Sequence, residues 1–498
     1  MSEAQDSFVK KEGEAFPGKT YAEHLLKHVF AYQRDYLYKE MFAIHYAHAV
    51  MLIECGILQK EEGKQILRGI REVEQHDFSV QEYDSRYEDL FFLVEDRIQE
   101  AIGSEKAGNM HIARSRNDMG VAMYRMVLRR HLLQLLDCSI MLGESLLEKA
   151  AEQKTTIVTA YTHTQPAQPT ALGHYFLAIF DGLGRDIKRL FQAYETVNRS
   201  PLGAAALATT GFPINRERVA QLLGFSGLVE NSYDAIAGAD YLLEASAAVA
   251  MLMTNAGRWI QDFLVQATKE FGGIVVADPY VQTSSIMPQK RNPVSIEHSR
   301  ALASSSYAEA LSVFHMIHNT PFGDIVDTED DLQPHLYRSC EKAKRVMHLM
   351  NAVIRTMHID KEKLEEKAKQ HAITITELAD VLTRDKGVSF RQAHKLASAI
   401  AKECNAKKIE LHELKPEEAS KLLSIQITEK EWHEITSPQV FVQRRCVQGG
   451  PCEQEMDRMI EDRQRHLQKL QEKAKQYTDK LKEADVLLQK VTEQYIKQ

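Results

Sequence analysis

Three short polar segments interrupt long apolar stretches of this chain. They read HIARSRND at 111–118, THTQ at 162–165 and SSIMPQKRNP at 284–293, and Glu297 follows the third. Histidine, serine, lysine and carboxylate are the side chains of proton transfer, and arginine is the usual partner of a carboxylate. Each segment also has a plain structural interpretation. A lone histidine can be structural, RSRND can cap a helix, and a serine-rich stretch can be a loop.

Long helices must position these segments. The chain of 498 residues has 24 glycines and 13 prolines, so turns are scarce and an all-β fold is excluded. Apolar residues recur at helical spacing over 20–103. Three further stretches are apolar on nearly every face: 123–147, 241–265 and 302–317. The sequence therefore predicts an all-α fold with a central bundle of buried helices, packed on each other or on partner chains.

Turn residues and composition divide the chain further. Turns are predicted at 162–169, 200–213 and 272–293, and a loop as long as the third is usually functional. We expect an N-terminal helical domain at 1–117, a central bundle at 118–364, a smaller C-terminal helical domain at 365–452 and a helical tail at 453–498.

The tail carries an apolar stripe of alternating three- and four-residue spacing. The stripe comprises Leu467, Leu470, Ala474, Tyr477, Leu481, Ala484, Leu488, Val491 and Tyr495. This spacing is typical of a coiled-coil seam between chains. An amphipathic helix lying on its own chain has the same pattern, so both interpretations stay open here.

Composition excludes several classes. A net charge of −8 argues against a nucleic-acid partner. The six cysteines are scattered without a CxxC pair, which is typical of a reduced, intracellular protein. The N-terminus has no signal-peptide core, and the apolar stretch 245–257 is too short to span a membrane. We therefore expect a cytoplasmic protein with no membrane partner.

No cofactor or metal is expected. The chain has no GxGxxG or P-loop run for a nucleotide. His24 and His28, like His45 and His48, are spaced as helical metal ligands, but no HExxH run or carboxylate completes a site. We interpret them as ordinary histidines on helix faces.

Taken together, the segments resemble one family. SSIMPQKRNP is similar to the signature loop of the fumarase/aspartase superfamily, and HIARSRND is similar to the HTGRSRND run of argininosuccinate lyases. YTHTQPAQP and SPQVFVQRRCVQGGP continue the similarity to that family, which covers roughly residues 18–460. The resemblance implies an all-α homotetramer with a twenty-helix central bundle, in which three subunits contribute to each active site. It implies anti-elimination of fumarate from an N-substituted aspartate, with argininosuccinate, which gives arginine and fumarate, as the first candidate.

The resemblance also implies roles for individual residues. Ser284 matches the catalytic base, and Lys290 and backbone N–H groups of its loop are available to stabilise its alkoxide. His163, oriented by Glu297, matches the group that assists protonation of the departing amine. Independently of the resemblance, the adjacent Gly272 and Gly273 can hinge this loop as a lid that excludes water. The residues expected to bind the dicarboxylate substrate are Arg114, Ser115, Arg116, Asn117, Thr162, Lys290 and Asn292.

The chain departs from the family pattern where the amine half of the substrate would bind. The family's histidine and arginine are Phe91 and Ala239 here, and its tyrosine, glutamine and lysine are Asp324, Glu329 and Leu332. Acidic replacements suit a cationic amine, although they can equally be surface or helix-capping residues. A paralogue that cleaves another N-substituted aspartate, such as ethylenediamine disuccinate, is therefore the alternative. A structural, non-catalytic member of the family is a remote one. Thr283 also replaces a family glycine, which leaves open which serine acts.

Overall fold

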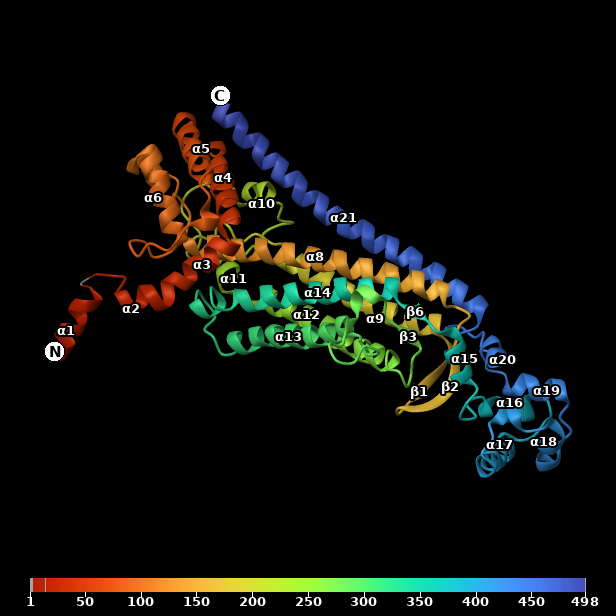
Figure 1. The fold of residues 1–498 in the computed structure, drawn as a ribbon. Coiled ribbons are helices and arrows are strands. Elements are labelled where there is room, and N and C mark those ends of the chain that lie inside the picture. The colour runs from red at the N-terminus through yellow and green to blue at the C-terminus, as the bar shows by residue number, and fades with distance from the viewer. Residues whose placement is uncertain (1–2, 14, 498) are drawn as a thin grey trace.

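Five long helices run side by side through the middle of the molecule (Figure 1). The structure is a computed structural model that describes residues 3–13 and 15–497. The bundle helices are α8 (Arg116–Glu152), α9 (Leu172–Val197), α12 (Asp240–Gln266), α13 (Val294–Ile317) and α14 (Gln333–Thr356). The predicted all-α fold is confirmed.

Helix α8 shows why the central stretches are apolar all round. It begins at a capping box in which Ser115 and Asp118 satisfy each other's backbone N–H groups. It then contacts α9, α14, α4 (Tyr38–Glu54) and α21 (Glu453–Lys497) on different sides. Its apolar side chains are therefore buried by its own chain. Helix α13 differs, because Tyr307 and Phe314 on its surface remain 40% and 38% exposed.

The N-terminal helices gather where α8 begins, except for the first two, which extend away from the rest of the chain (Figure 1). They are α1 (Glu3–Glu12), α2 (Lys19–Tyr21), a π-helical turn (Ala22–Leu26), α3 (Lys27–Tyr36), α4, α5 (Lys60–Glu74), α6 (Leu90–Ile102) and α7 (Ser104–Asn109). Two short helices, α10 (Arg216–Leu222) and α11 (Ser232–Ala237), lie at the same end.

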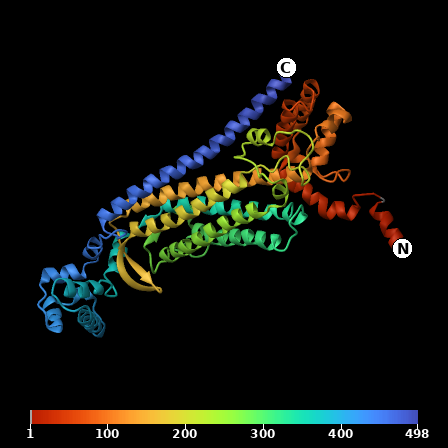
Figure 2. The same ribbon diagram turned by 180° about the vertical axis from the view of Figure 1, so that it is seen from behind.

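A second group of short helices lies at the opposite end (Figure 2). It contains α15 (Lys361–Ala368), α16 (Ile375–Arg384), α17 (Phe390–Lys407), α18 (Pro416–Leu423), α19 (Glu429–Thr436) and α20 (Pro438–Gln443). Residues between Leu378 and Ile435 form a hydrophobic cluster separate from the central core. The buried Trp432 closes it by donating its indole N–H to the Leu414 carbonyl at 2.7 Å. The domain boundaries themselves stay predictions.

The strands are few and short, and none of the three pairs among the described residues is predicted by the sequence. β3 (Ile274–Val275) pairs with β6 (His358–Ile359), and β4 (Gln282–Thr283) pairs with β5 (Arg291–Asn292). The predicted turn at 162–169 lies instead in a hairpin of β1 (Ile157–Thr162) and β2 (Gln165–Ala171). The sequence does not predict β2 because it contains Pro166 and Pro169, and proline argues against a strand unless that strand lies at the edge of a sheet.

The C-terminal helix α21 lies along its own chain (Figures 1 and 2). Its stripe residues Leu467, Leu470, Ala474, Leu488 and Val491 are buried in the central core. Arg463 pairs with Asp181 of α9 at 2.8 Å, which anchors the same face. Of the two interpretations of the heptad pattern, the structure therefore shows a helix packed on its own body.

The expectation that all the cysteines are reduced is wrong for one pair. Cys446 and Cys452 form a disulfide, while Cys55, Cys138, Cys340 and Cys404 are free. The turn at Gly449–Pro451 brings the pair together, with Cα atoms 5.1 Å apart. Among the described residues, no helix has both the length and the apolar character needed to cross a membrane.

Candidate active site

The first polar segment forms the N-terminus of α8. Ser115 is the N-cap, and its Oγ accepts a hydrogen bond from the Asn117 N–H at 3.2 Å. The buried carboxylate of Asp118 accepts hydrogen bonds from the backbone N–H groups of Gly203 and Ala205 at 2.9 and 3.0 Å. Burial raises the pKa of Asp118 to about 6, although these hydrogen bonds favour its charged form. Asp118 thus ties the segment to the predicted turn at 200–213.

Arg116 and Asn117 face an acidic surface. Arg116 lies 3.3 Å from both Glu88 and Asp89, and its guanidinium stacks over the Phe92 ring at 4.6 Å. The side-chain amide of Asn117 donates to Asp324 at 2.7 Å. A fixed cation and an amide donor therefore stand next to carboxylates at this end of the bundle.

Arg114 is placed differently from the sequence expectation. Its side chain is only 1% exposed, and it donates to the imidazoles of His45 and His111. The guanidinium of Arg114 is therefore closed to a substrate in this chain, and a role of Arg114 in substrate binding stays a prediction. The sequence does not reveal its partners, because His45 lies 69 residues away and its spacing from His48 predicts only histidines on a helix face.

The second polar segment is the tip of the β1–β2 hairpin. Thr162 pairs with Gln165, which leaves His163 and Thr164 as a two-residue turn. Both have positive φ, 52° and 62°, as a type I′ turn requires. The turn presents the imidazole of His163 to solvent, and Thr162 is also exposed.

The third polar segment lies in the loop between α12 and α13. The Oγ atom of Ser284 accepts hydrogen bonds from the backbone N–H groups of Met287 and Ile286 at 3.1 and 3.4 Å. Donors in this position stabilise negative charge on a serine oxygen. Lys290 and Glu297 are exposed and Asn292 is half-buried. Gly272 has φ +58°, a left-handed conformation that favours glycine, and a Cβ there would displace the end of the Lys363 side chain.

One chain does not bring the three segments together. The first segment begins α8, and the hairpin follows its end. Helix α8 has 37 residues, so these sites are separated by roughly 55 Å at 1.5 Å per residue. The loop that carries the third segment starts near the hairpin, since the rings of Tyr161 and of Phe271, which follows the end of α12, are 6.0 Å apart. Within one chain, the first segment therefore lies far from the other two.

Replacements at the family's amine-binding positions fall into two groups. Phe91 and Leu332 are buried in the central core and present no polar group. Asp324 contacts Asn117, and Glu329 and Asp330 lie in the same segment. Burial, reinforced by the charges of Glu329 and Asp89, raises the pKa of Asp330 to about 7. Among the described residues, no group of three metal-ligating side chains is placed to hold an ion.

Comparison with known proteins defines the class. A family model described as Lyase matches residues 26–305, and one described as Argininosuccinate lyase C-terminal matches residues 372–443. A class II fumarase from Schistosoma mansoni has a similar structure, with a TM-score of 0.67 at 16% identity over 86% of this chain and 95% of the fumarase. The fold is thus that of the fumarase/aspartase superfamily.

More similar proteins narrow the class to a family. Argininosuccinate lyase 2 of Agrobacterium fabrum is 39% identical over 89% of both chains. The argininosuccinate lyase of Methanocaldococcus jannaschii is 36% identical over 83% of this chain and 85% of its own. The structure of an EDDS lyase in complex with formate has a TM-score of 0.85 at 31% identity, covering 95% of this chain and 93% of that one. The chain belongs to the argininosuccinate lyase family of carbon–nitrogen lyases.

Proposed function

We propose that this chain forms a homotetramer that cleaves argininosuccinate to arginine and fumarate in active sites shared between subunits, and that it works in the cytoplasm. The observation that carries the proposal is the separation of the first polar segment from the other two by the length of α8. A site that needs all three segments requires more than one chain.

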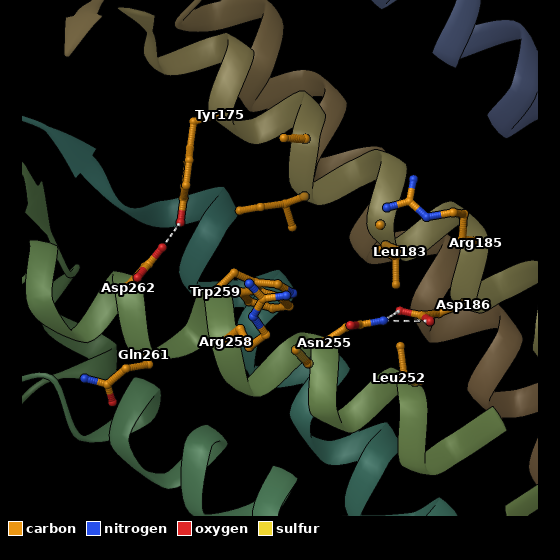
Figure 3. A pocket seen from close by; sticks show the side chains of 14 residues that line it. Tyr175, Leu183, Arg185, Asp186, Leu252, Asn255, Arg258, Trp259, Gln261 and Asp262 are labelled. Carbon is orange, nitrogen blue, oxygen red and sulfur yellow. Dashed lines mark hydrogen bonds between the residues drawn. The ribbon is translucent and has the colours of Figure 1, made fainter. Parts of the chain in front are cut away.

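Surfaces of the bundle support association. Met251, Tyr307 and Phe314 on α12 and α13 are large apolar side chains that one chain leaves exposed. A groove of about 510 Å³ also lies between α9 and α12 (Figure 3). Its walls carry ordered polar pairs, such as Tyr175 with Asp262 at 3.0 Å, beside Trp259. None of the three polar segments lines this groove, so we assign it to subunit contact rather than to catalysis.

The proposed chemistry starts at Ser284. Removal of the proton next to the substrate carboxylate leaves two negative charges on one group, which requires surrounding donors. The N–H groups of Ile286 and Met287 already point at the Ser284 oxygen, and Lys290 adds positive charge. Ser115, Asn117, Thr162 and Asn292 would donate to the substrate carboxylates, and Arg116 would supply the fixed cation.

The second half of the reaction is departure of the amine. His163, oriented by Glu297 of another subunit, would assist its protonation. The structure of one chain contains no hydrogen bond between these two side chains among the described residues, which is why we assign them to different subunits. Gly272 and Gly273 would allow the loop to close over the site.

A specific observation favours another N-substituted aspartate as the second candidate substrate. The acidic side chains Asp324, Glu329 and Asp330 replace or adjoin positions where the family pattern has neutral or basic ones. Asp324 lies directly against Asn117. Charge alone does not separate the two candidates, because argininosuccinate also carries a cationic guanidinium. The loss of the family's side chains for the arginine half is what favours a more compact cationic amine, such as that of a diamine disuccinate.

The test is fumarate release from a panel of N-substituted aspartates, followed by the ultraviolet absorbance of fumarate. Turnover of argininosuccinate would support the first candidate. Turnover of ethylenediamine disuccinate without turnover of argininosuccinate would favour the second. Absence of fumarate from every member of the panel would contradict both.

A further inference from the structure

A cluster of buried polar side chains lies directly behind the first polar segment. We define the arginine cluster as His45, Glu95, His111 and Arg114. The Nη1 atom of Arg114 is 3.0 Å from His45 Nδ1, and its Nη2 atom is 3.3 Å from His111 Nδ1. Glu95 pairs with His111 and lies 3.6 Å from Arg114. Helix α4, helix α6 and the turn before α8 are thus joined around one guanidinium.

The contacts fix the proton positions in the arginine cluster. A guanidinium only donates, so both imidazoles must accept through Nδ1 and carry their proton on Nε2. Burial, followed by the charge of Arg114, lowers the pKa of His45 well below its usual value and that of His111 to about 3. The Nε2–H of His111 is then free to donate to Glu95. Phe91 provides an apolar wall, with its ring 6.2 Å from His45 and 5.6 Å from His111.

The turn in front of Ser115 needs such an anchor. Ala113 has φ +61°, a left-handed conformation that an alanine adopts unwillingly because of its Cβ. The similar family run has glycine at this position, HTGRSRND against HIARSRND. The residues on both sides of Ala113 are fixed by contacts with other parts of the chain. His48 contacts the Ile112 carbonyl at 2.9 Å, and the side chain of Arg114 is enclosed in the arginine cluster.

We infer that the arginine cluster is a positioning device that holds the left-handed turn at Ala113 and so fixes Ser115, Arg116 and Asn117 where the substrate carboxylates bind. The inference rests on the proposed function for the role of Ser115–Asn117. His45 is its most specific element, because it comes from α4 and joins a helix remote in sequence to the start of α8. None of the four side chains needs to touch the substrate.

The experiment compares two matched substitutions in the full-length enzyme. His45→Leu removes the acceptor for Arg114 at similar volume, whereas His45→Asn keeps an acceptor at the position of Nδ1. We expect H45L to raise KM at least tenfold and to change kcat less than threefold, because weakened substrate positioning acts on binding. The KM and kcat of H45N should stay near the parental values. Adding Ala113→Gly to H45L should bring KM most of the way back to the parental value, because glycine adopts a positive φ without the anchor.

A parental KM in folded H45L would overturn the inference, and so would an H45L/A113G double variant that is no better than H45L. If H45L does not fold, Ala113→Val replaces it, because a β-branched residue strains the same turn. The KM of A113V should rise in the same way, and a parental KM would contradict the inference.

Failure of the proposed function would show differently, as absence of fumarate release by the parent enzyme. A crystal structure of H45L then tests the geometry alone. We expect residues 113–117 to move, and an unchanged backbone would refute the positioning role.

Discussion

The side-chain amide of Asn117 donates a hydrogen bond to the carboxylate of Asp324 at 2.7 Å, across 207 residues of sequence. This contact joins the start of α8 to the segment that precedes α14. It places a residue expected to bind the substrate carboxylates next to one expected to bind the amine. Burial raises the pKa of Asp324, and a cationic amine nearby would restore its charged form.

Asp324→Asn should therefore weaken binding of a substrate with a cationic amine. The amide keeps the shape and the contact with Asn117 but loses the charge. We expect KM for such a substrate to rise about tenfold, which corresponds to about 1.4 kcal/mol. Steady-state kinetics measure it, with Asp327→Asn as the control, since Asp327 is an exposed carboxylate of the same segment. Equal KM values for D324N and the parent would remove Asp324 from the site.

Ser284→Ala should lower kcat by about a thousandfold, the scale of a lost general base. The proposed tetramer should stay intact in S284A, because Ser284 lies in a loop rather than in the bundle. Ser285→Ala is the matched control, and light scattering checks assembly. A large loss in S285A with activity retained in S284A would assign proton transfer to the second serine.

Leu470→Ala should destabilise the folded chain by about 2–4 kcal/mol, the usual cost of a cavity in a well-packed core. Leu470 is buried between α21 and the bundle of its own chain. Val486→Ala on the outer face is the control, since Val486 is 64% exposed, and it should cost less than about 0.5 kcal/mol. Urea unfolding gives both values. A loss of assembly in L470A without a loss of chain stability would mean that the seam joins different chains.

Glu309 should make stability fall in acid. Burial alone would raise its pKa, but hydrogen bonds from Arg338, Lys342 and His335 outweigh it and lower the pKa from 4.5 to about 2. A lowered folded-state pKa gives stability that is present above pH 4.5 and is lost as the pH falls toward 2. Glu309→Gln should flatten the pH dependence of the unfolding free energy in that range. An identical slope in E309Q and the parent would exclude this carboxylate as the cause.

The long helices were the predictable part of the fold. Periodicity and scarce turn residues are local signals, so α8 and α12 could be located from sequence. The β1–β2 hairpin could not, because its turn residues, His163 and Thr164, are not the usual ones for positive φ. The heptad stripe of α21 predicted a buried face but not its partner, since the same pattern suits either chain.

The candidate site was predictable in its residue types and less so in its geometry. Ser115, Asn117 and Ser284 were found from motif resemblance. Arg114 stood in the same motif, but only the fold shows that it is buried against His45, 69 residues away. No local pattern links those two positions. The contact between Asn117 and Asp324 is hidden for the same reason.

The most direct test of shared active sites mixes two inactive variants. Asn117→Leu removes a residue at the start of α8, and His163→Asn removes the hairpin imidazole beyond its end. If each site draws these residues from different subunits, an equal mixture allowed to exchange subunits should regain about a quarter of the parental activity, because one random site in four escapes both substitutions. A mixture of Asn117→Leu with Ser115→Ala, both in one segment, should regain none. Failure of the first mixture to regain activity, with subunit exchange verified, would contradict active sites shared between subunits.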